Sequence, residues 1–311
     1  MRTDLNALAL PALFDALVDR GRLDALIGLA FDEDLGREGD VTTTAFVPPT
    51  VTASAAIVAR GDGVVAGLRV VERVLSSRGR DVRWSMRTSD GATCRRGDVL
   101  VELHGPLANI LPLERTMLNF LGRLSGIASL TRRYVDEATG TSAKICCTRK
   151  TTPGWRDIEK YAVRCGGGWL HRIGLYDAML VKDNHLGAVA AGGLAAALTS
   201  ACRAARARHD LRFVEVEVDT MEQLDVVLGL EPGVVDIVLL DNFDVAMLRD
   251  AVRRRAALGK RVELEASGGV RLDRVRAIAE TGVDRISCGA LTHGAVSLDV
   301  ALDLVDEAAR R

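Results

Sequence analysis

Six short apolar segments recur along the chain from residue 143 onward, and each one ends in polar residues or glycine. The stretches between the last five are rich in Ala, Leu and Arg, and their apolar positions are spaced as in helices. Short strands that alternate with helices are typical of βαβ units and a parallel sheet. The segments span residues 143–150, 178–185, 213–219, 235–242, 262–269 and 284–291.

The first 124 residues have a different pattern. Residues 5–31 place apolar side chains at helical spacing, interrupted by one proline and one glycine, and residues 34–43 have the polar composition of a loop. Between residues 51 and 104 short alternating strands with Gly-Asp turns follow, with one helix over residues 68–79. This part of the chain is therefore expected to form a separate domain rich in strands.

We therefore expect an α/β protein: a βα barrel of the TIM type with a smaller N-terminal domain. The smaller domain is predicted over residues 1–124 and the barrel over residues 125–295. An amphipathic helix over residues 110–124 leads into the barrel, and helical spacing over residues 296–311 predicts a C-terminal helix.

In a closed βα barrel the functional groups lie where the strands end, on the C-terminal rim. The predicted strand ends of this chain collect cations, carboxylates and glycines, which are the groups that bind anions and metal-bound phosphates. We expect the barrel to enclose a small polyanion. The residues at these strand ends are Arg149, Lys150, Lys182, Glu217, Asp241, Ser267, Gly268, Gly269, Gly289 and Ala290.

Lysine is rare in this chain, with five lysines among 41 basic residues. A lysine is a compact point charge that approaches an anionic centre where a planar guanidinium does not fit. Lys150 and Lys182 both lie at predicted strand ends and are candidate site residues. Lys144, Lys160 and Lys260 are expected to be ordinary surface charges.

Charge and composition exclude several classes of partner. The formal net charge is −1, so no overall field attracts nucleic acid or an anionic membrane. No apolar stretch is long enough to span a bilayer, and the N-terminus lacks the pattern of a secretory signal, so a cytoplasmic protein is expected. Six cysteines without a CxxC spacing are expected to be reduced and mostly buried.

The densest chemistry lies between residues 148 and 185. Arg149 and Lys150 are adjacent at one strand end, and His171 and Arg172 follow a loop of three glycines. Guanidinium groups bind carboxylates in a bidentate way, so several converging cations fit a ligand with two carboxylates or several phosphates. The alternative is that Arg149 and Arg172 form ordinary surface ion pairs.

The remaining histidines point less clearly to a site. His104, His209 and His293 lie outside any cluster of candidate residues and are expected to be structural or exposed, whereas His185 at a strand end fits either a structural or a site role. An HExxH motif is absent, which argues against bound zinc.

The run TRKTTPGWRDIEKYAVRCGGGWLHRIGLYDAMLVKDNH resembles the signature of the quinolinate phosphoribosyltransferase family. The motifs EDLGREGDVTT, GPLANILPLERTMLNFLGRLSGIASLT, VEVEVDTMEQLD, VLLDNF, LEASGGV and CGALTH follow the family's order, so the resemblance covers nearly the whole chain. It implies a small α/β sandwich domain and an irregular α/β barrel. One departure is Leu170, where the family usually has Asn before the His-Arg pair, so a local hydrogen bond is expected to be missing.

The resemblance also implies residue roles. Arg115 would enter the active site of a partner subunit, which requires a homodimer or a higher homo-oligomer. Glu217 and Asp241 would reach the ribose hydroxyls and the water ligands of Mg²⁺, and Lys150 and Lys182 join them as catalytic residues. Glu215 shares a strand face with Glu217 and is expected to form a buried pair. The quinolinate carboxylates would be held by Arg149, His171 and Arg172, with Thr148 nearby, and the 5′-phosphate by Ser267, Gly268, Gly269, Gly289 and Ala290.

The activity implied by the resemblance is phosphoribosyl transfer from phosphoribosyl pyrophosphate to quinolinate with loss of CO₂. The products are nicotinate mononucleotide and pyrophosphate, as in de novo NAD biosynthesis. Two alternatives stay open at this point. One is a relative that acts on another acid, such as the molybdenum-operon paralogues, and the other is a non-catalytic metabolite-binding protein.

Overall fold

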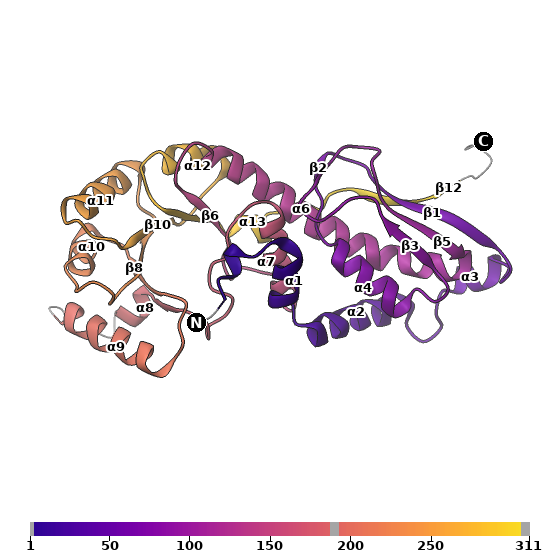
Figure 1. Cartoon of the computed structure of the whole chain (residues 1–311), viewed down its shortest axis with the longest axis horizontal. Coiled ribbons are helices and arrows are strands. Elements are labelled where there is room, and N and C mark those ends of the chain that lie inside the picture. Colours follow the sequence, from indigo (N-terminus) through magenta and orange to yellow (C-terminus); the bar gives the residue numbers. More distant parts are fainter. Residues whose placement is uncertain (1–2, 187–192, 306–311) are drawn as a thin grey trace. The chain divides into compact units, whose positions relative to one another are not determined.

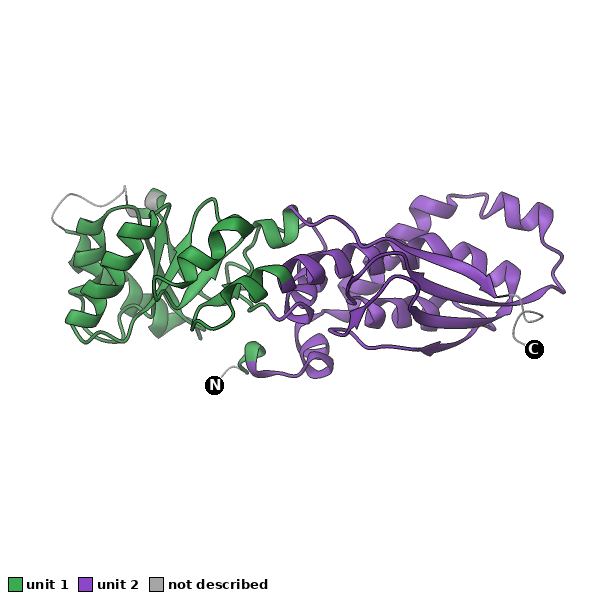
Figure 2. Ribbon diagram, turned by 90° about the horizontal axis from the view of Figure 1, so that it is seen from above, with its two compact units in different colours: residues 1–6, 133–151, 168–293 green, residues 7–132, 152–167, 294–311 purple. Residues whose placement is uncertain are grey.

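A computed structural model describes residues 3–186 and 193–305 of the chain (Figure 1). These residues form two compact units (Figure 2). Unit 1 comprises residues 1–6, 133–151 and 168–293, and unit 2 comprises residues 7–132, 152–167 and 294–311.

Unit 1 is built on six parallel strands in the order β6-β11-β10-β9-β8-β7. Each strand lies inside one of the six apolar segments, which confirms the predicted strands. Together with the intervening helices they form the irregular α/β barrel that the sequence predicts (Figure 1). The strands are β6 (Lys144–Cys146), β7 (Met179–Val181), β8 (Val214–Val218), β9 (Ile237–Asp241), β10 (Glu263–Ser267) and β11 (Arg285–Ser287).

Helices follow the barrel strands in turn, and two of them start at residues whose side chains cap the first backbone N–H groups. The Thr220 hydroxyl accepts the Gln223 N–H at the start of α10, and the Asp244 carboxylate accepts the Met247 N–H at the start of α11. The helices are α8 (Asp183–Leu186), α9 (Leu194–Arg208), α10 (Met221–Leu228), α11 (Val245–Ala257), α12 (Leu272–Ala279) and α13 (Ala290–His293).

Strand register brings the carboxyl ends of the barrel strands to one level. Asp241 on β9 pairs with Ser267 on β10, and Ser287 on β11 pairs with Cys146 on β6. Because parallel strands all point the same way, the residues that follow them meet at one rim. This rim is where the sequence places the site.

Unit 2 contains an antiparallel sheet in the order β12-β1-β5-β3 and a two-stranded sheet of β2 and β4. Its strands are β1 (Thr52–Ala59), β2 (Gly63–Val64), β3 (Arg83–Met86), β4 (Thr93–Cys94), β5 (Val99–Pro106) and β12 (Val300–Val305). The helical segments outside the barrel alternation are η1 (Leu5–Ala7), α1 (Leu10–Leu17), α2 (Arg20–Leu35), α3 (Val41–Phe46), α4 (Leu68–Arg78), α5 (Leu107–Ile110), η2 (Leu111–Leu113), α6 (Glu114–Ala138) and α7 (Arg156–Cys165).

The predicted C-terminal helix over residues 296–311 is wrong. Residues 300–305 instead form β12, which pairs antiparallel with β1 from Ser54↔Val305 to Ala59↔Val300. The short sequence VALDLV fits both a helical and a strand period, and the backbone hydrogen bonds offered by the edge of β1 decide between them. Residues 306–311 lie outside the described residues.

The predicted boundaries also change in detail. Helix α6 runs without a break through the expected boundary after residue 124. Residues 152–167 join unit 2, where Phe14 of α1 and Tyr161 of α7 pack edge to face at 5.0 Å between ring centroids. The expected loop over residues 34–43 is shorter, because α3 starts at Val41 and is capped by Asp40, whose carboxylate accepts the Thr43 N–H.

Among the described residues, no helix is both long and apolar enough to cross a membrane.

Candidate active site

The structure brings the predicted strand-end residues to the carboxyl rim of the barrel. Each comes from the end of a different strand or from the turn that follows it, which is how a barrel assembles one site from distant parts of a sequence. Arg149 and Lys150 follow β6, Lys182 follows β7, Glu217 lies near the end of β8, Asp241 ends β9, Ser267 ends β10 ahead of Gly268 and Gly269, and Gly289 and Ala290 follow β11.

Two guanidinium groups dominate one side of this rim. Arg172 is only 7% exposed, and its burial together with the nearby Arg149 charge lowers the pKa of Arg172 from its ordinary value. Neither guanidinium forms an ion pair with a carboxylate of the described residues, and Arg149 Nε is buried without a hydrogen-bond acceptor. The alternative of ordinary surface ion pairs is therefore wrong, and both guanidinium groups have donors available to a ligand.

The backbone that carries Arg172 is held by a buried carboxylate that sequence reasoning missed. Asp177 accepts the N–H groups of Ile173 and Gly174 at 2.9–3.0 Å, and Arg212 Nη1 lies 3.4 Å from it. An aspartate in a glycine-containing turn is a known acceptor for nearby backbone N–H groups, so a signal was present.

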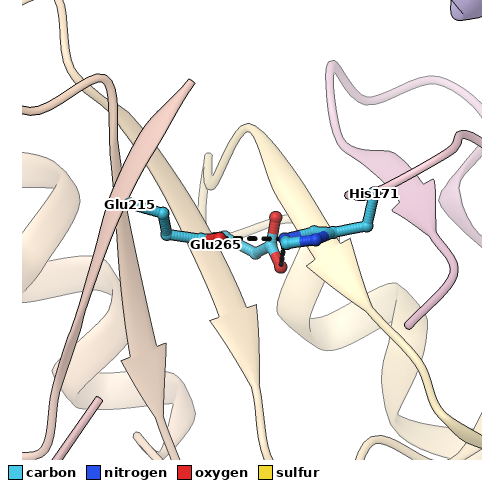
Figure 3. Close-up of side chains that lie close together, drawn as sticks. All are labelled: His171, Glu215 and Glu265. Carbon is cyan, nitrogen blue, oxygen red and sulfur yellow. Dashed lines mark ion pairs between the residues drawn. The ribbon is translucent and has the colours of Figure 1, made fainter. Parts of the chain in front are cut away.

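His171 is buried and contacts protein groups through both ring nitrogens. Figure 3 shows its contacts with Glu215 and Glu265. Its Nδ1 accepts the Arg172 N–H at 2.8 Å, and its Nε2 lies 2.9 Å from Glu215 Oε2 and 3.2 Å from Glu265 Oε1. The whole residue is 6% exposed. A direct contact with a substrate carboxylate, as the resemblance implies, would require one of these contacts to break.

The expected buried pair of Glu215 is confirmed, since it faces His171. Burial disfavours a charged ring, whereas the Glu265 and Glu215 carboxylates act in the opposite direction and raise the pKa of His171. Burial, followed by the Glu265 charge, also raises the pKa of Glu215, so the two groups compete for one proton. The hydrogen bond from Arg172 N–H decides this competition, because it requires a lone pair on Nδ1 and so favours the proton on Glu215.

Glu265 and Arg285 complete this buried cluster, and sequence reasoning missed both. Arg285 Nε donates to Glu265 Oε2 at 2.7 Å. Although burial acts in the opposite direction, the contact with His171 and the Arg285 charge lower the pKa of Glu265 from its ordinary value. Charged residues within the short, otherwise apolar strands β10 and β11 were the available signal.

On the other side of the rim, Lys182 and Glu217 form an ion pair with 2.8 Å between Nζ and Oε2. Glu217, Asp219 and Asp241 each offer a carboxylate oxygen, and these three oxygens lie within 4.8 Å of one another. Asp219 is a further residue that sequence reasoning did not single out. Such an all-oxygen set fits the ligand preference of Mg²⁺, held directly or through water.

Glycines at two strand ends keep the backbone accessible. Gly268 has a φ of +93°, and an added Cβ would overlap the Asn242 side chain and lie 2.8 Å from the Asn242 backbone nitrogen. Gly269 has a φ of +55° and open space around it. An added Cβ at Gly289 would lie 2.9 Å from Lys150 Cδ and 3.2 Å from His293 Nε2.

The turn that presents Lys150 is fixed by two threonines. Thr148 Oγ1 accepts the Lys150 N–H at 3.0 Å, and Thr292 Oγ1 donates to the Lys150 carbonyl at 2.6 Å. Thr148 therefore shapes the turn. His293, which was expected to lie outside the site, is exposed beside Lys150 and Gly289.

The structure also describes three other residues that the sequence analysis discussed. Lys160 is fully buried, so its assignment as a surface charge is wrong. His185 Nδ1 accepts the Lys182 N–H at 2.9 Å, which is a structural contact. Leu170 is buried, and its backbone is paired on both sides by the Asn6 amide, which receives the Leu170 N–H at 2.7 Å and donates to its carbonyl at 3.1 Å.

Arg115 belongs to α6 in unit 2. Its side chain is 61% exposed, and its Nη2 lies 3.6 Å from the neighbouring Glu114 carboxylate. An exposed ion pair of this kind contributes little to stability, so the guanidinium is available to another ligand.

A substitution at Gly289 tests the phosphate side of the rim. We expect Gly289→Val to weaken phosphoribosyl pyrophosphate binding by about 10- to 150-fold, the effect of losing one charge-assisted contact, because the new side chain displaces Lys150. Isothermal calorimetry measures this affinity. Gly61→Ala is the control, since its Cβ would meet only an ordinary contact at 3.6 Å. Intact affinity in a folded Gly289→Val protein would contradict the assignment.

Comparison with known families and proteins gives a consistent result. Residues 40–125 match the family described as Quinolinate phosphoribosyl transferase, N-terminal domain, and residues 127–303 match the corresponding C-terminal domain. The nicotinate-nucleotide pyrophosphorylase [carboxylating] of Mycobacterium leprae is 44% identical over 279 residues, covering 88% of this chain and 94% of the relative. The probable enzyme of that name from Bacillus subtilis is 40% identical over 285 residues, covering 91% and 93%.

Solved structures agree with these sequence relatives. The nicotinate-nucleotide pyrophosphorylase from Francisella tularensis has a TM-score of 0.83 at 33% identity, and the alignment covers 98% of this chain and all of that one. The structure from Ehrlichia chaffeensis has a TM-score of 0.81 at 36% identity, covering 91% and 98%.

Proposed function

The chain belongs to the quinolinate phosphoribosyltransferase family, and on this premise we propose how its barrel site carries out the family's reaction. The reaction transfers the phosphoribosyl group of phosphoribosyl pyrophosphate to quinolinate and releases CO₂. It yields nicotinate mononucleotide and pyrophosphate, a step of NAD biosynthesis. The chain is thus an enzyme of the pentosyltransferase class.

The pair of Arg149 and Arg172 is the observation that carries this function. Two neighbouring guanidiniums without an ion-pair partner among the described residues repel one another, and burial together with this repulsion lowers the pKa of Arg172. A ligand with two adjacent carboxylates removes the repulsion and satisfies the unused donors. Quinolinate is such a ligand, and Arg149 and Arg172 bind its carboxylates.

The chemical step needs little proton transfer at its start. The pyridine nitrogen of quinolinate has a free lone pair near neutral pH and attacks C1 of the ribose, while pyrophosphate leaves. Lys150 and Lys182 neutralise the charge that develops on the leaving group. Glu217 and Asp241 bind the ribose hydroxyls and hold the sugar in position for in-line attack.

Decarboxylation follows from the charge on the ring. Once the nitrogen carries the ribose it is positively charged, and loss of the adjacent carboxylate as CO₂ leaves a carbanion that this charge stabilises. Protonation of that carbon gives nicotinate mononucleotide. The backbone groups of Ser267, Gly268, Gly269, Gly289 and Ala290 hold the 5′-phosphate through both steps.

Mg²⁺ is the proposed cofactor. Glu217 and Asp241 would hold it through water, and Asp219 supplies a third carboxylate at the same place. When bound, the ion supplies neutralising charge for the pyrophosphate group.

We further propose a homodimer or higher homo-oligomer with shared sites. The exposed side chain of Arg115 and the resemblance of its motif support a role in the site of a partner subunit. The six cysteines are all buried and form no disulfide bond, which fits a reducing compartment such as the cytoplasm.

Release of labelled CO₂ tests the function directly. With quinolinate labelled at the 2-carboxylate, phosphoribosyl pyrophosphate and Mg²⁺, we expect ¹⁴CO₂ and nicotinate mononucleotide in equal amounts. Omission of either substrate or of Mg²⁺ is the control and should abolish release. Transfer to another acid without ¹⁴CO₂ would favour a paralogue with a different substrate, and binding without turnover would favour a metabolite-binding protein.

A further inference from the structure

A row of charges, all buried except Glu263, crosses the barrel interior. Glu263 contacts Arg285 at 3.3 Å, Arg285 donates to Glu265 at 2.7 Å, and Glu265 lies 3.2 Å from His171 Nε2. Glu215 approaches the same nitrogen at 2.9 Å from another strand. Both Glu215 and Glu265 are fully buried, so neither contacts a ligand on the rim.

The other ring nitrogen of His171, Nδ1, is connected to the substrate site through the backbone of Arg172. Nδ1 accepts the Arg172 N–H, and this contact requires that the ring proton reside on Nε2. The two carboxylates that flank Nε2 select this form, because each is an acceptor that needs a donor. As Figure 3 shows, Glu215 and Glu265 converge on the ring edge from the side away from the His171 backbone.

Fixing this N–H completes a row of anchored backbone groups. The N–H groups of Ile173 and Gly174 are bound by Asp177, and that of Arg172 is bound by His171. Three successive N–H groups with buried acceptors leave the main chain at Arg172 one conformation. This fixes the direction in which the Arg172 side chain leaves the main chain towards the rim.

We propose that His171, Glu215, Glu265 and Arg285 are positioning residues of the dicarboxylate site, which act on substrate only by holding Arg172. Arg285 orients Glu265, the two glutamates fix the His171 ring and its tautomer, and the ring fixes the Arg172 backbone. This rests on the proposed function for the identity of the ligand, but the tautomer of His171 is a property of the free protein.

Glu265→Gln is the decisive variant, with Glu263→Gln as its matched control. Glu265 must accept from Arg285 and from His171, and an amide cannot accept from both. In Glu265→Gln the charged Arg285 guanidinium keeps the amide oxygen as its acceptor, so the N–H₂ faces His171 Nε2. Two donors then oppose one another at Nε2, and Nδ1 is expected to lose its role as acceptor of the Arg172 N–H. Glu263 shares the Arg285 contact but does not touch His171, so Glu263→Gln should leave the ring unchanged.

Binding of both substrates is the first readout. We expect Glu265→Gln to raise the Kd for quinolinate by about 10- to 100-fold, the range found when an outer partner of a ligand-binding side chain is removed. The Kd for phosphoribosyl pyrophosphate should change by less than about threefold, whereas general destabilisation would weaken both. Glu215→Gln should keep quinolinate affinity, because the amide oxygen still accepts from Nε2.

Nitrogen-15 NMR of the histidine ring is the second readout, and it does not depend on any ligand. With ¹⁵N-labelled histidine and His171→Asn for assignment, wild type and Glu263→Gln should show a protonated Nε2 and a bare Nδ1 at His171. In Glu265→Gln, Nε2 should no longer carry the ring proton and Nδ1 should no longer be bare. If the wild-type protein has the expected tautomer of His171 but does not bind quinolinate, the proposed function is wrong while the positioning network stands.

Three results would overturn the positioning network. The first is a proton on Nδ1 of His171 in the wild-type protein. The second is unchanged quinolinate affinity in a folded Glu265→Gln protein whose wild type binds quinolinate. The third is a stoichiometric metal ion in purified protein that Glu265→Gln removes, since that would make His171, Glu215 and Glu265 a metal site.

Discussion

Replacing Arg149 or Arg172 with Ala should abolish most quinolinate binding and leave phosphoribosyl pyrophosphate binding nearly intact. Each guanidinium offers a fork of donors that matches a carboxylate, and loss of one charge-assisted bidentate contact costs about 2–4 kcal/mol, or roughly 30- to 1,000-fold in affinity. Titration calorimetry with each substrate separately measures the two affinities.

The two variants differ in what they do to the free protein. Arg172 is buried beside a like charge, so Arg172→Ala removes a repulsion that the unliganded protein carries. We therefore expect no loss of thermal stability in that variant, in contrast to its loss of affinity. Arg261→Ala, an exposed arginine at the opposite ends of the strands, is the control for nonspecific charge effects. An equal loss of affinity for both substrates would argue against the dicarboxylate assignment.

The barrel could be predicted because its signal is local. Each strand is a short apolar run, and each run ends in the residues that the rim requires, as in Ile237–Asp241 and Glu263–Ser267. Parallel order then places those ends together without further information. The residues of the rim follow from the local pattern of the chain for this reason.

The errors share a different physical origin. VALDLV fits two periods, and only the free edge of β1 selects the strand. Residues 152–167 were expected in the barrel domain, but they join unit 2, where Tyr161 packs on Phe14. Lys160 has the sequence context of a surface charge and is fully buried. In each case tertiary contacts, which a local pattern does not encode, decide the outcome.

His171 illustrates the same limit within the site. Its place next to Arg172 and after a glycine loop predicts a site residue, and the resemblance implies contact with substrate. In the structure the ring lies between Glu215 and Glu265, which are far away in sequence. The sequence pattern thus locates the group, whereas the direction of its contacts depends on how its loop packs against β8 and β10.

A shared site can be tested by mixing two inactive proteins. If Arg115 serves a partner's site, the functional unit is at least a two-fold dimer with isologous contacts. Arg115→Ala and Lys182→Ala should each be nearly inactive alone, because one removes a contact supplied by the partner and the other a charge supplied by the chain itself. In a mixed dimer one site carries both defects and the other carries none.

After subunit exchange, activity in the ¹⁴CO₂ assay should recover to about a quarter of wild type, since half of the dimers are mixed and half of their sites are intact by two-fold symmetry. Mixing Lys150→Ala with Lys182→Ala is the matched control. Both residues belong to the same chain's rim, so every site of that mixed dimer keeps one defect and no activity should return. If exchange is demonstrated by mass spectrometry and the Arg115 mixture also stays inactive, Arg115 acts in its own chain's site or outside the site altogether.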